Sequence, residues 1–328
     1  MSRLRADDAQ SLPAAAARLA AGELLAFPTE TVYGLGARAD DDAAVRRIFE
    51  AKGRPAEHPL IVHVADTEQA RRFAAHWPAQ AQKLADAFWP GPLTLIVPRQ
   101  PEMGLAAAGG HSSIGLRVPA YPLAQALMRE ALRLGVPGVA APSANRFGRV
   151  SATRAEHVEQ EFGAGLAVLD GGDCPGGIES TIVDCTGMVP VLLRPGLLPR
   201  ERIEALLGGH LGQPDAQSPR VSGSLRSHYA PQAKLRLMES AALRDALAVL
   251  GAPGPELKLA VYSRSGMPLG RGIEQRRMPQ DPAAAAHELF AVLRDFDEQR
   301  VQIIWVEQPP ADPAWEGVRD RLQRAAAA

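Results

Sequence analysis

The sequence predicts an α/β protein, with a twisted mixed sheet in a larger first domain and a second, smaller Rossmann-like α/β domain. Its 328 residues exceed the length of an average domain, which favours two domains. Short apolar runs alternate with amphipathic stretches, as strands and helices do in an α/β sheet. Residues 209–232 are rich in Gly, Pro, Ser and Gln and lack this alternation, which indicates a linker. The predicted organisation is therefore a domain at 1–208, a linker at 209–232 and a domain at 233–328.

Strands of the first domain are predicted where a short apolar run stands between turn-forming residues. Such runs occupy residues 23–27, 60–64, 93–97, 138–141, 166–169, 181–184 and 191–193. Helical periodicity predicts helices at residues 43–51, 67–76, 79–88 and 122–134. Two helix starts carry capping signals: the acidic run Asp40–Asp42, and Thr153 with Glu156 as a T-x-x-E capping box for a further helix.

The alternation resumes after the linker and predicts the second domain. Strands are expected at residues 234–237, 257–262 and 302–306, and helices at 241–250, at 282–298 and from about Ala314. Asp281 is expected to cap the second of these helices. The segment contains no G-x-G-x-x-G, so its Rossmann-like pattern alone does not imply a dinucleotide.

Composition and charge exclude several classes of protein. The net charge of −1 argues against bulk electrostatic binding of nucleic acid, although it permits a local basic cleft. The two cysteines, Cys174 and Cys185, make no disulfide framework and lack the histidine spacing of a zinc site. The amino terminus does not resemble a signal peptide, and no apolar stretch approaches the roughly 18 residues that span a membrane. We expect a cytoplasmic protein with no membrane association.

Polar side chains gather at the ends of the predicted strands, where α/β sheets bind their ligands. They are Thr29, Glu30 and Thr31 after the first strand, Lys52, Arg54 and His63 around the second, Ser143 and Asn145 after the fourth, Glu179 and Ser180 before the sixth, and Arg194 at the seventh. Each alone has a structural explanation: a turn or cap for Ser and Thr, a core position for His63, a strand exit for Arg194, or an edge strand for Arg117. Their coincidence in six loops predicts a functional site.

The chemistry of this set favours binding and electrostatic stabilisation. Lys52, Arg54, Arg117 and Arg194 supply permanent positive charge, and arginine suits bidentate recognition of carboxylate or phosphate. Hydroxyl groups beside them can orient a small polar substrate. The sequence contains no G-x-S-x-G elbow, Cys-His pair or acid pair. We therefore expect no covalent catalysis by the protein.

Five motifs in this order carry a specific resemblance: FPTETVYGLG, AKGRPAEHPLIVHV, PSANRFGRVSAT, GIESTIVD and LRPG. Together they resemble the YrdC-like domain of threonylcarbamoyl-AMP synthases. The later SHYAP segment and the trailing small α/β domain resemble the two-domain branch of that family. The resemblance covers almost the whole chain and is more specific over the first 208 residues.

The resemblance implies a twisted YrdC-like sheet around a positively charged concave site. It also implies an enzyme that joins L-threonine, bicarbonate or CO2, and ATP into threonylcarbamoyl-AMP and releases pyrophosphate. A downstream threonylcarbamoyl transferase complex then modifies tRNA. Magnesium is expected to arrive with ATP, and the sequence names no protein ligand for it. The chemistry, carbamate attack on the α-phosphorus, requires alignment and charge neutralisation.

Motif by motif, the resemblance assigns residues to two substrates. The threonine pocket would comprise Thr31, His63, Arg117, Ser143 and Ser180, with Arg117 on the α-carboxylate. Contacts to ATP would come from Arg54, His58, Ser113, Asn145, Thr153 and Arg194. Lys52 and Arg54 are the catalytic candidates, with Lys52 expected to neutralise phosphate charge. Residues 209–232 would form an active-site lid, with Tyr229 contacting ATP.

Two residues depart from the family pattern, and two other functions compete with the synthase. Phe147 follows S-A-N-R where relatives carry a small or polar residue, and His58 stands where many have asparagine. A related carbamoyl-adenylate chemistry would require accessory zinc-finger and acylphosphatase-like segments, which this chain lacks. A non-catalytic RNA-binding module would require aromatic stacking platforms, yet aromatic residues make up only 5% of the chain.

Overall fold

The computed structural model describes residues 3–223, 225–252, 254, 256–267 and 270–328. The chain divides into two compact units, and each is described by itself. The first unit comprises Met1–Phe147 and Ser151–Ser224, and the second comprises Gly148–Val150 and Leu225–Ala328. The boundary between the longer segments therefore lies within the predicted linker.

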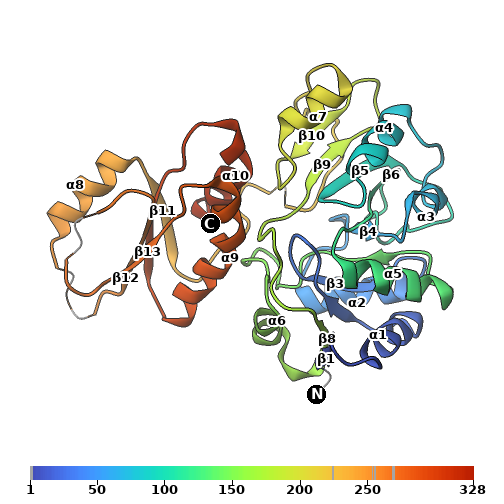
Figure 1. Ribbon diagram of the computed structural model, residues 1–328, viewed down its shortest axis with the longest axis horizontal. Coiled ribbons are helices and arrows are strands. Elements are labelled where there is room, and N and C mark those ends of the chain that lie inside the picture. Colours follow the sequence, from blue (N-terminus) through green and yellow to red (C-terminus); the bar gives the residue numbers. More distant parts are fainter. Residues whose placement is uncertain (1–2, 224, 253, 255, 268–269) are drawn as a thin grey trace. The chain divides into compact units, whose positions relative to one another are not determined.

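The first unit is built on a mixed sheet with the strand order β1-β8-β2-β3-β7-β4-β6-β5-β9-β10 (Figure 1). Both parallel pairs, such as β4 with β6, and antiparallel pairs, such as β5 with β6, occur within it. This confirms the predicted mixed sheet. The strands are β1 (Arg3–Arg5), β2 (Leu25–Phe27), β3 (Gly34–Arg38), β4 (Ile61–His63), β5 (Leu93–Pro98), β6 (Ser113–Arg117), β7 (Val139–Ala140), β8 (Ala167–Asp170), β9 (Thr181–Asp184) and β10 (Val191–Arg194).

Helices of the first unit begin largely where the sequence predicts. They are α1 (Ser11–Ala20), α2 (Asp42–Lys52), α3 (Thr67–Arg72), α4 (Ala79–Phe88), α5 (Pro122–Arg133), α6 (Ala155–Phe162) and α7 (Arg200–Leu207), with a short 3-10 turn, η1 (Gly163–Gly165). The Asp41 side chain accepts hydrogen bonds from the amides of Ala43 and Ala44, which confirms the acidic start signal of α2.

The predicted T-x-x-E capping box is wrong. The residue that caps α6 is Arg154, and it makes no side-chain capping bond. Thr153 instead lies one residue further from the helix, and its amide donates to Nδ1 of His157 at 3.2 Å. The His157 ring thus accepts from the Thr153 amide, the role that the predicted box gives to the Glu156 carboxylate, so another local contact replaces the predicted one.

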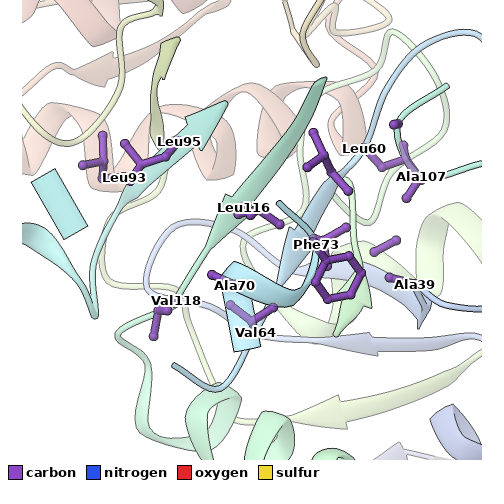
Figure 2. Close-up of a cluster of buried hydrophobic side chains, with 14 of the residues drawn as sticks. Ala39, Leu60, Val64, Ala70, Phe73, Leu93, Leu95, Ala107, Leu116 and Val118 are labelled. Atoms are coloured by element: carbon purple, nitrogen blue, oxygen red, sulfur yellow. The ribbon is translucent and has the colours of Figure 1, made fainter. Parts of the chain in front are cut away.

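Alternating side chains along β2 show how the sheet is covered on both faces. Leu25 and Phe27 belong to a buried cluster that includes residues of α1 and α5. Ala26 points to the other face and belongs to a cluster that includes residues of α2 and α4. Figure 2 shows part of this second cluster, with Leu116 between Leu95 and Phe73 in this view. The helices thus cover opposite faces around the middle of the sheet.

The far half of the sheet leaves one face without a helix. Ile61 of β4, Ile96 of β5 and Ile182 of β9 form an apolar cluster whose other described members are Leu193, Val191 and Val221. None of these lies in a described helix. The predicted site residues His63 and Arg117 are register partners on the same face as Ile61.

The second unit has a parallel sheet with the order β11-β14-β12-β13. Its strands are β11 (Lys234–Met238), β12 (Leu259–Ser263), β13 (Ile273–Arg277) and β14 (Ile303–Glu307), and its helices are α8 (Ser240–Leu250), α9 (Pro282–Glu298) and α10 (Glu316–Ala326), with the short η2 (Pro313–Trp315). Asp281 accepts from the amide of Ala284 at 2.8 Å, so its predicted role as the cap of α9 is confirmed. The predicted Rossmann-like pattern of strands and helices is confirmed.

The predicted linker is irregular in backbone but partly buried. Leu211 joins the main core, and the backbone of Gly212 pairs with Val191. His228 and Tyr229 are buried, at 5% and 0% exposure. The polar, irregular sequence of residues 227–231 predicts that they lie outside a core, and this is wrong for His228 and Tyr229. Ser224 lies outside the described part of the chain. No described helix is long and apolar enough to cross a bilayer.

Candidate active site

The turn between β2 and β3 contains the threonines of FPTETVYGLG, and the two have different roles. Thr29 Oγ1 donates to the carbonyl of Val32 at 2.7 Å and accepts from the amides of Thr31 and Val32 at 3.2 Å. Thr29 therefore holds the turn itself, which is the structural role expected of a turn hydroxyl. Thr31 Oγ1 lies 2.7 Å from Thr29 Oγ1 and also meets Arg117.

Arg117 is the buried cation next to this turn. It ends β6, is 3% exposed, and donates through Nη1 to Thr31 Oγ1 at 3.1 Å and through Nε to the carbonyl of Gly91 at 3.3 Å. Its Nη2 lies 2.6 Å from Oε1 of Glu30. The edge-strand explanation of Arg117 is wrong, because β6 lies between β4 and β5. A buried guanidinium held on one side by backbone suits recognition of a carboxylate on the other.

His63 stands beside Arg117 on the neighbouring strand. The two are register partners between β4 and β6, so their side chains share the uncovered face. Burial, with a smaller contribution from the Arg117 charge, lowers the pKa of His63 to about 3. The ring therefore stays neutral, packs edge-on against Phe27 at 6.1 Å, and adds polarity without charge.

Ser180, directly before β9, and Arg194, at the end of β10, form a second buried group. Arg194 donates through Nη2 to the carbonyl of Ser180 at 2.8 Å and to its hydroxyl at 3.1 Å. That hydroxyl also lies 2.8 Å from Oγ1 of Thr94. The LRPG motif needs its glycine, since a Cβ on Gly196 would lie 2.4 Å from the carbonyl oxygen of Glu179. These bonds therefore join Arg194, which is assigned to ATP, with Ser180, which is assigned to threonine.

Lys52 connects the end of α2 to the S-A-N loop. Its Nζ donates to the carbonyl of Ser143 at 2.6 Å and to that of Asn145. The loop is also paired with the first turn, because the amide of Ala144 donates to the carbonyl of Tyr33 at 2.8 Å. This arrangement buries Lys52, which is 3% exposed. Its ammonium therefore both orders the loop and brings positive charge to it.

The two departures from the family pattern, His58 and Phe147, lie against each other. Their ring centroids are 5.4 Å apart, and the guanidinium of Arg54 lies 5.6 Å from the Phe147 ring. The amide of Phe147 donates to the carbonyl of Lys52 at 2.9 Å. Burial and the Arg54 charge lower the pKa of His58. Phe147 thus packs on the K-x-R segment, and the loop keeps its bond to Lys52.

A pocket opens on the uncovered face beside the predicted ATP residue Ser113. It is lined by strand residues and by part of the predicted linker: Pro59, Leu60, Ile61, Ile96, His111, Ser113, Gly115, Ile182, Arg220, Val221 and Ser222. Arg194 Nη1 donates to the carbonyl of Ser222 at 2.8 Å, which attaches this linker segment to the site. The pocket is mainly apolar with a polar rim, as small-molecule sites usually are.

Tyr229 belongs to the second unit. Its ring stacks on Phe290 at 5.5 Å, meets His228 at 4.2 Å, and lies under the guanidinium of Arg321 at 5.0 Å. Complete burial among these neighbours makes Tyr229 a core residue of its unit. Its contact with ATP stays a prediction.

The site residues that sequence reasoning missed are Glu30 as an ion-pair partner, Thr94, and residues 220–222. Glu30 lies in the quoted motif, but a motif does not reveal which way a side chain points. Thr94 is a polar residue inside the apolar run LTLIV, which is a usable signal. Residues 220–222 carry no such signal, because only the folded chain brings them to β9 and β10.

The arrangement contains buried cations and hydroxyls and no activated thiol. Burial raises the pKa of Cys174 above its ordinary range and that of Cys185 to about 12, so both thiols stay protonated. Among the described residues, no group of three His, Cys, Asp or Glu side chains is placed to hold a metal. The geometry suits binding of an anionic, hydroxyl-bearing substrate and stabilisation of developing negative charge.

Two family models together match almost the whole chain. One, described as "Telomere recombination", matches residues 17–196, and the other, described as "Threonylcarbamoyl-AMP synthase, C-terminal domain", matches residues 198–327. The threonylcarbamoyl-AMP synthase of Bacillus subtilis (strain 168) is 39% identical over 327 residues, which cover 95% of this chain and 92% of the relative. That of Pyrococcus abyssi is 38% identical and covers 93% and 90%.

Solved structures agree over the same extent. P. abyssi Sua5 complexed with L-threonine matches with a TM-score of 0.89 and 35% identity, covering 99% of this chain and 97% of that one. A double-alanine variant of P. abyssi Sua5 matches with a TM-score of 0.90 and 34% identity, covering 99% and 96%. The similarity therefore includes both units.

Proposed function

The chain belongs to the threonylcarbamoyl-AMP synthase family, and we propose that the uncovered face of its first unit is the active site. The reaction of this family joins L-threonine, bicarbonate or CO2, and ATP, and it releases pyrophosphate. Its product serves the threonylcarbamoyladenosine modification of tRNA. One observation carries this placement: Arg117, buried and bonded to Thr31, stands beside a neutral His63 where no helix covers the sheet. The P. abyssi neighbour solved with L-threonine supports the choice of amino acid.

The threonine subsite is built from Thr31, His63, Arg117, Ser143 and Ser180. Arg117 binds the α-carboxylate with its guanidinium fork, since this is the geometry that pairs best with a carboxylate. The hydroxyls of Thr31 and Ser180 orient the polar groups of the amino acid. His63, being neutral, accepts or donates one hydrogen bond without disturbing the charge balance.

The ATP subsite follows the basic loops and the pocket beside Ser113. Arg54, His58, Ser113, Asn145, Thr153 and Arg194 contact the nucleotide, and Tyr229 acts from the lid. Lys52 and Arg54 lie nearest the transferred phosphate. Buried positive charge of this kind is effective because water does not screen it. Magnesium arrives with ATP as part of the substrate.

The reaction needs alignment more than a protein nucleophile. The α-amino nitrogen of threonine first bonds to CO2 and loses a proton, which gives the carbamate. A carbamate oxygen then bonds to the α-phosphorus of ATP while the bond from that phosphorus to the leaving pyrophosphate breaks. Lys52, Arg54 and Arg194 offset the negative charge that spreads over the phosphates. Arg117 and the hydroxyls hold the carbamate in line, which lowers the entropic part of the barrier.

Two further statements about cellular context belong to the same proposal. The product is passed to a threonylcarbamoyl transferase complex that acts on tRNA, because the adenylate is a reactive intermediate that requires an acceptor. The reaction takes place in the cytoplasm, as the composition of the chain predicts.

The direct test is pyrophosphate release by the purified protein with each substrate omitted in turn. Release that requires L-threonine, bicarbonate, ATP and magnesium together is the expected result. Equal release without threonine, or no release under any combination, would contradict the function. Thr29→Ser serves as a control beside the site, because it keeps the hydroxyl that holds the turn and lies 2.7 Å from Oγ1 of Thr31.

A further inference from the structure

Glu30 is a buried carboxylate that the assignment of substrate contacts leaves unused. Its side chain is 12% exposed, and one oxygen lies 2.6 Å from Nη2 of Arg117. Both oxygens are buried, and no described residue donates a hydrogen bond to either of them. The contact with Arg117 is thus an ion pair by distance, without the alignment of a hydrogen bond.

Burying such a carboxylate in the folded protein costs free energy unless another group binds it. A buried charge needs both an opposite charge and hydrogen bonds to balance its desolvation. The backbone at this position is nevertheless held in place by hydrogen bonds. The amide of Gly176 donates to the carbonyl of Glu30 at 2.8 Å, and the amide of Gly177 donates to the carbonyl of Thr31 at 3.1 Å. The loop therefore holds the Glu30 carboxylate, whose oxygens accept no hydrogen bond from a described residue, beside Arg117, which is proposed to bind the substrate carboxylate.

The other acidic residues of the region are already engaged. Oε1 of Glu179 accepts from the hydroxyl of Ser151 at 2.5 Å. Asp170 accepts from Arg3 at 2.8 Å and from the amide of Gly172 at 3.0 Å. Glu30 alone combines burial, nearness to Arg117 and open acceptor positions.

We propose that Glu30 binds the α-ammonium group of the amino-acid substrate. The inference rests on the proposed function, in which Arg117 binds the α-carboxylate. An amino acid carries its ammonium one carbon from its carboxylate, so its two partners must be adjacent, as Glu30 and Arg117 are. The substrate zwitterion then replaces the internal pair: Arg117 exchanges Glu30 for the substrate carboxylate, and Glu30 exchanges Arg117 for the ammonium.

This exchange makes Glu30 a specificity residue. A carboxylic acid without the amino group must still displace Glu30 from Arg117 but offers nothing to Glu30 in return. The intact site should therefore discriminate against 3-hydroxybutyrate, which resembles threonine without its α-amino group. Removing the charge of Glu30 should weaken threonine and leave 3-hydroxybutyrate unchanged or slightly better bound.

The experiment is calorimetric titration of L-threonine and of 3-hydroxybutyrate into the full chain and its Glu30→Gln variant. We expect Glu30→Gln to weaken threonine about 10- to 100-fold, the usual range for one charge-assisted hydrogen bond, without weakening 3-hydroxybutyrate. Glu30→Asp, which keeps the charge, should recover part of the loss. Asp184→Asn is the matched control, because Asp184 is a buried carboxylate of β9 that bonds to Thr186 away from Arg117.

The outcomes separate this inference from the proposed function. Equal weakening of both ligands by Glu30→Gln would indicate a purely structural role, and unchanged threonine affinity would remove Glu30 from the site. Either result overturns the inference while threonine-dependent pyrophosphate release by the unmodified chain still stands. If the unmodified chain neither binds threonine nor releases pyrophosphate, the proposed function itself fails. ATP binding by each variant shows that the first unit is folded.

Discussion

Glu30 of the first unit and Glu307 of the second unit both have a buried carboxylate, and the two carboxylates have opposite surroundings. Glu307 of the second unit is 1% exposed and accepts from the amide and hydroxyl of Ser265 at 2.7 and 2.8 Å, with Arg264 3.6 Å away. Glu30 of the first unit has an arginine at 2.6 Å but no aligned hydrogen bond. A satisfied buried charge stabilises a fold, whereas an incompletely satisfied one indicates where a ligand completes the bonding.

The two units also differ in the surroundings of a buried arginine. In the second unit Arg321 lies over Tyr229 at 5.0 Å and pairs at 2.6 Å with Asp320, whose side chain is 15% exposed. Arg117 in the first unit faces the helix-free side of the sheet. Burial of a cation is therefore not by itself evidence of a site, and the nature and orientation of its partners decide.

Replacing Lys52 should have the largest effect on activity. Lys52→Met removes a buried charge and both bonds to the S-A-N loop, so pyrophosphate release should fall about 100- to 1000-fold, as on loss of a group that stabilises transition-state charge. Lys83→Met on the exposed side of α4 is the matched control. An unaltered rate in Lys52→Met would show that the loop and the phosphates do not depend on this ammonium.

Tyr229 tests whether a residue buried in the second unit also serves the nucleotide. Tyr229→Ala should lower the unfolding free energy of that unit by about 3 to 5 kcal/mol, the usual cost of removing a buried aromatic ring. Hydrogen exchange measured on peptides of α9 and β11 reports this unit separately. The lid hypothesis adds weaker ATP binding and more ATP hydrolysed per threonylcarbamoyl-AMP formed.

Tyr229→Phe separates the two roles, because it keeps the ring that stacks on Phe290 and removes only the hydroxyl. Weaker ATP binding with normal hydrogen exchange would support the lid. Normal ATP binding and intermediate yield in both variants would leave Tyr229 as a packing residue alone.

The next largest effect is expected from changing the shape of a buried arginine side chain in each unit. Arg117→Lys keeps the charge but loses the planar fork, so the KM for threonine should rise about 30-fold, equivalent to ~2 kcal/mol for a lost charge-assisted bond. Affinity for ATP should change little. Arg321→Lys should instead lower the stability of the second unit and leave the threonine KM unchanged. If Arg117→Lys and Arg321→Lys changed the threonine KM by the same factor, the distinction between a site arginine and a core arginine would be wrong.

The sequence predicts much of this fold because periodicity and caps are local. Residues 79–88, 181–184 and 282–298 were predicted with the bounds that the structure has. The misses have physical causes. β3 and β6 contain glycines and read as loops, yet Gly36 lies where a Cβ would meet Phe27 and Val139 at 2.8 Å. β13 is a polar edge strand whose exposed residues carry no apolar pattern.

The site was predictable in composition but not in pairing. Polar residues such as Thr31 and Ser143 could be chosen because they follow predicted strands, where ligands gather, whereas the substrate roles of Arg117 and Ser180 came from the motif resemblance. Which of them touch depends on register: His63 meets Arg117 only because β4 and β6 are parallel neighbours. The approach of Glu30 to Arg117 and of residues 220–222 to Arg194 depends on contacts distant in sequence. No local pattern reports such contacts.

The smallest expected effect concerns the two glutamates and pH. Burial opposes the charge of Glu307, but the bonds from Ser265 outweigh it and hold the pKa of Glu307 below its ordinary value. A depressed folded-state pKa stabilises the fold at pH values above the unfolded pKa, roughly 4.3 for glutamate, and this contribution is lost as the pH falls through the folded value. Glu307→Gln should therefore lower the stability of the second unit at neutral pH by about 1 kcal/mol and flatten its decline in acid.

Glu30→Gln provides the comparison in the first unit. Because the carboxylate of Glu30 accepts no aligned bond from a described residue, and the amide oxygen of a glutamine in its place can still lie against Arg117, Glu30→Gln should lower the stability of its unit by less than Glu307→Gln lowers the stability of the second unit. Hydrogen exchange of peptides from β3 and from β14, followed from neutral to acid pH, measures both units in one sample. If Glu30→Gln destabilises its unit as much as Glu307→Gln does, Glu30 is a structural charge, and the contrast between a completed and an incomplete buried carboxylate is wrong.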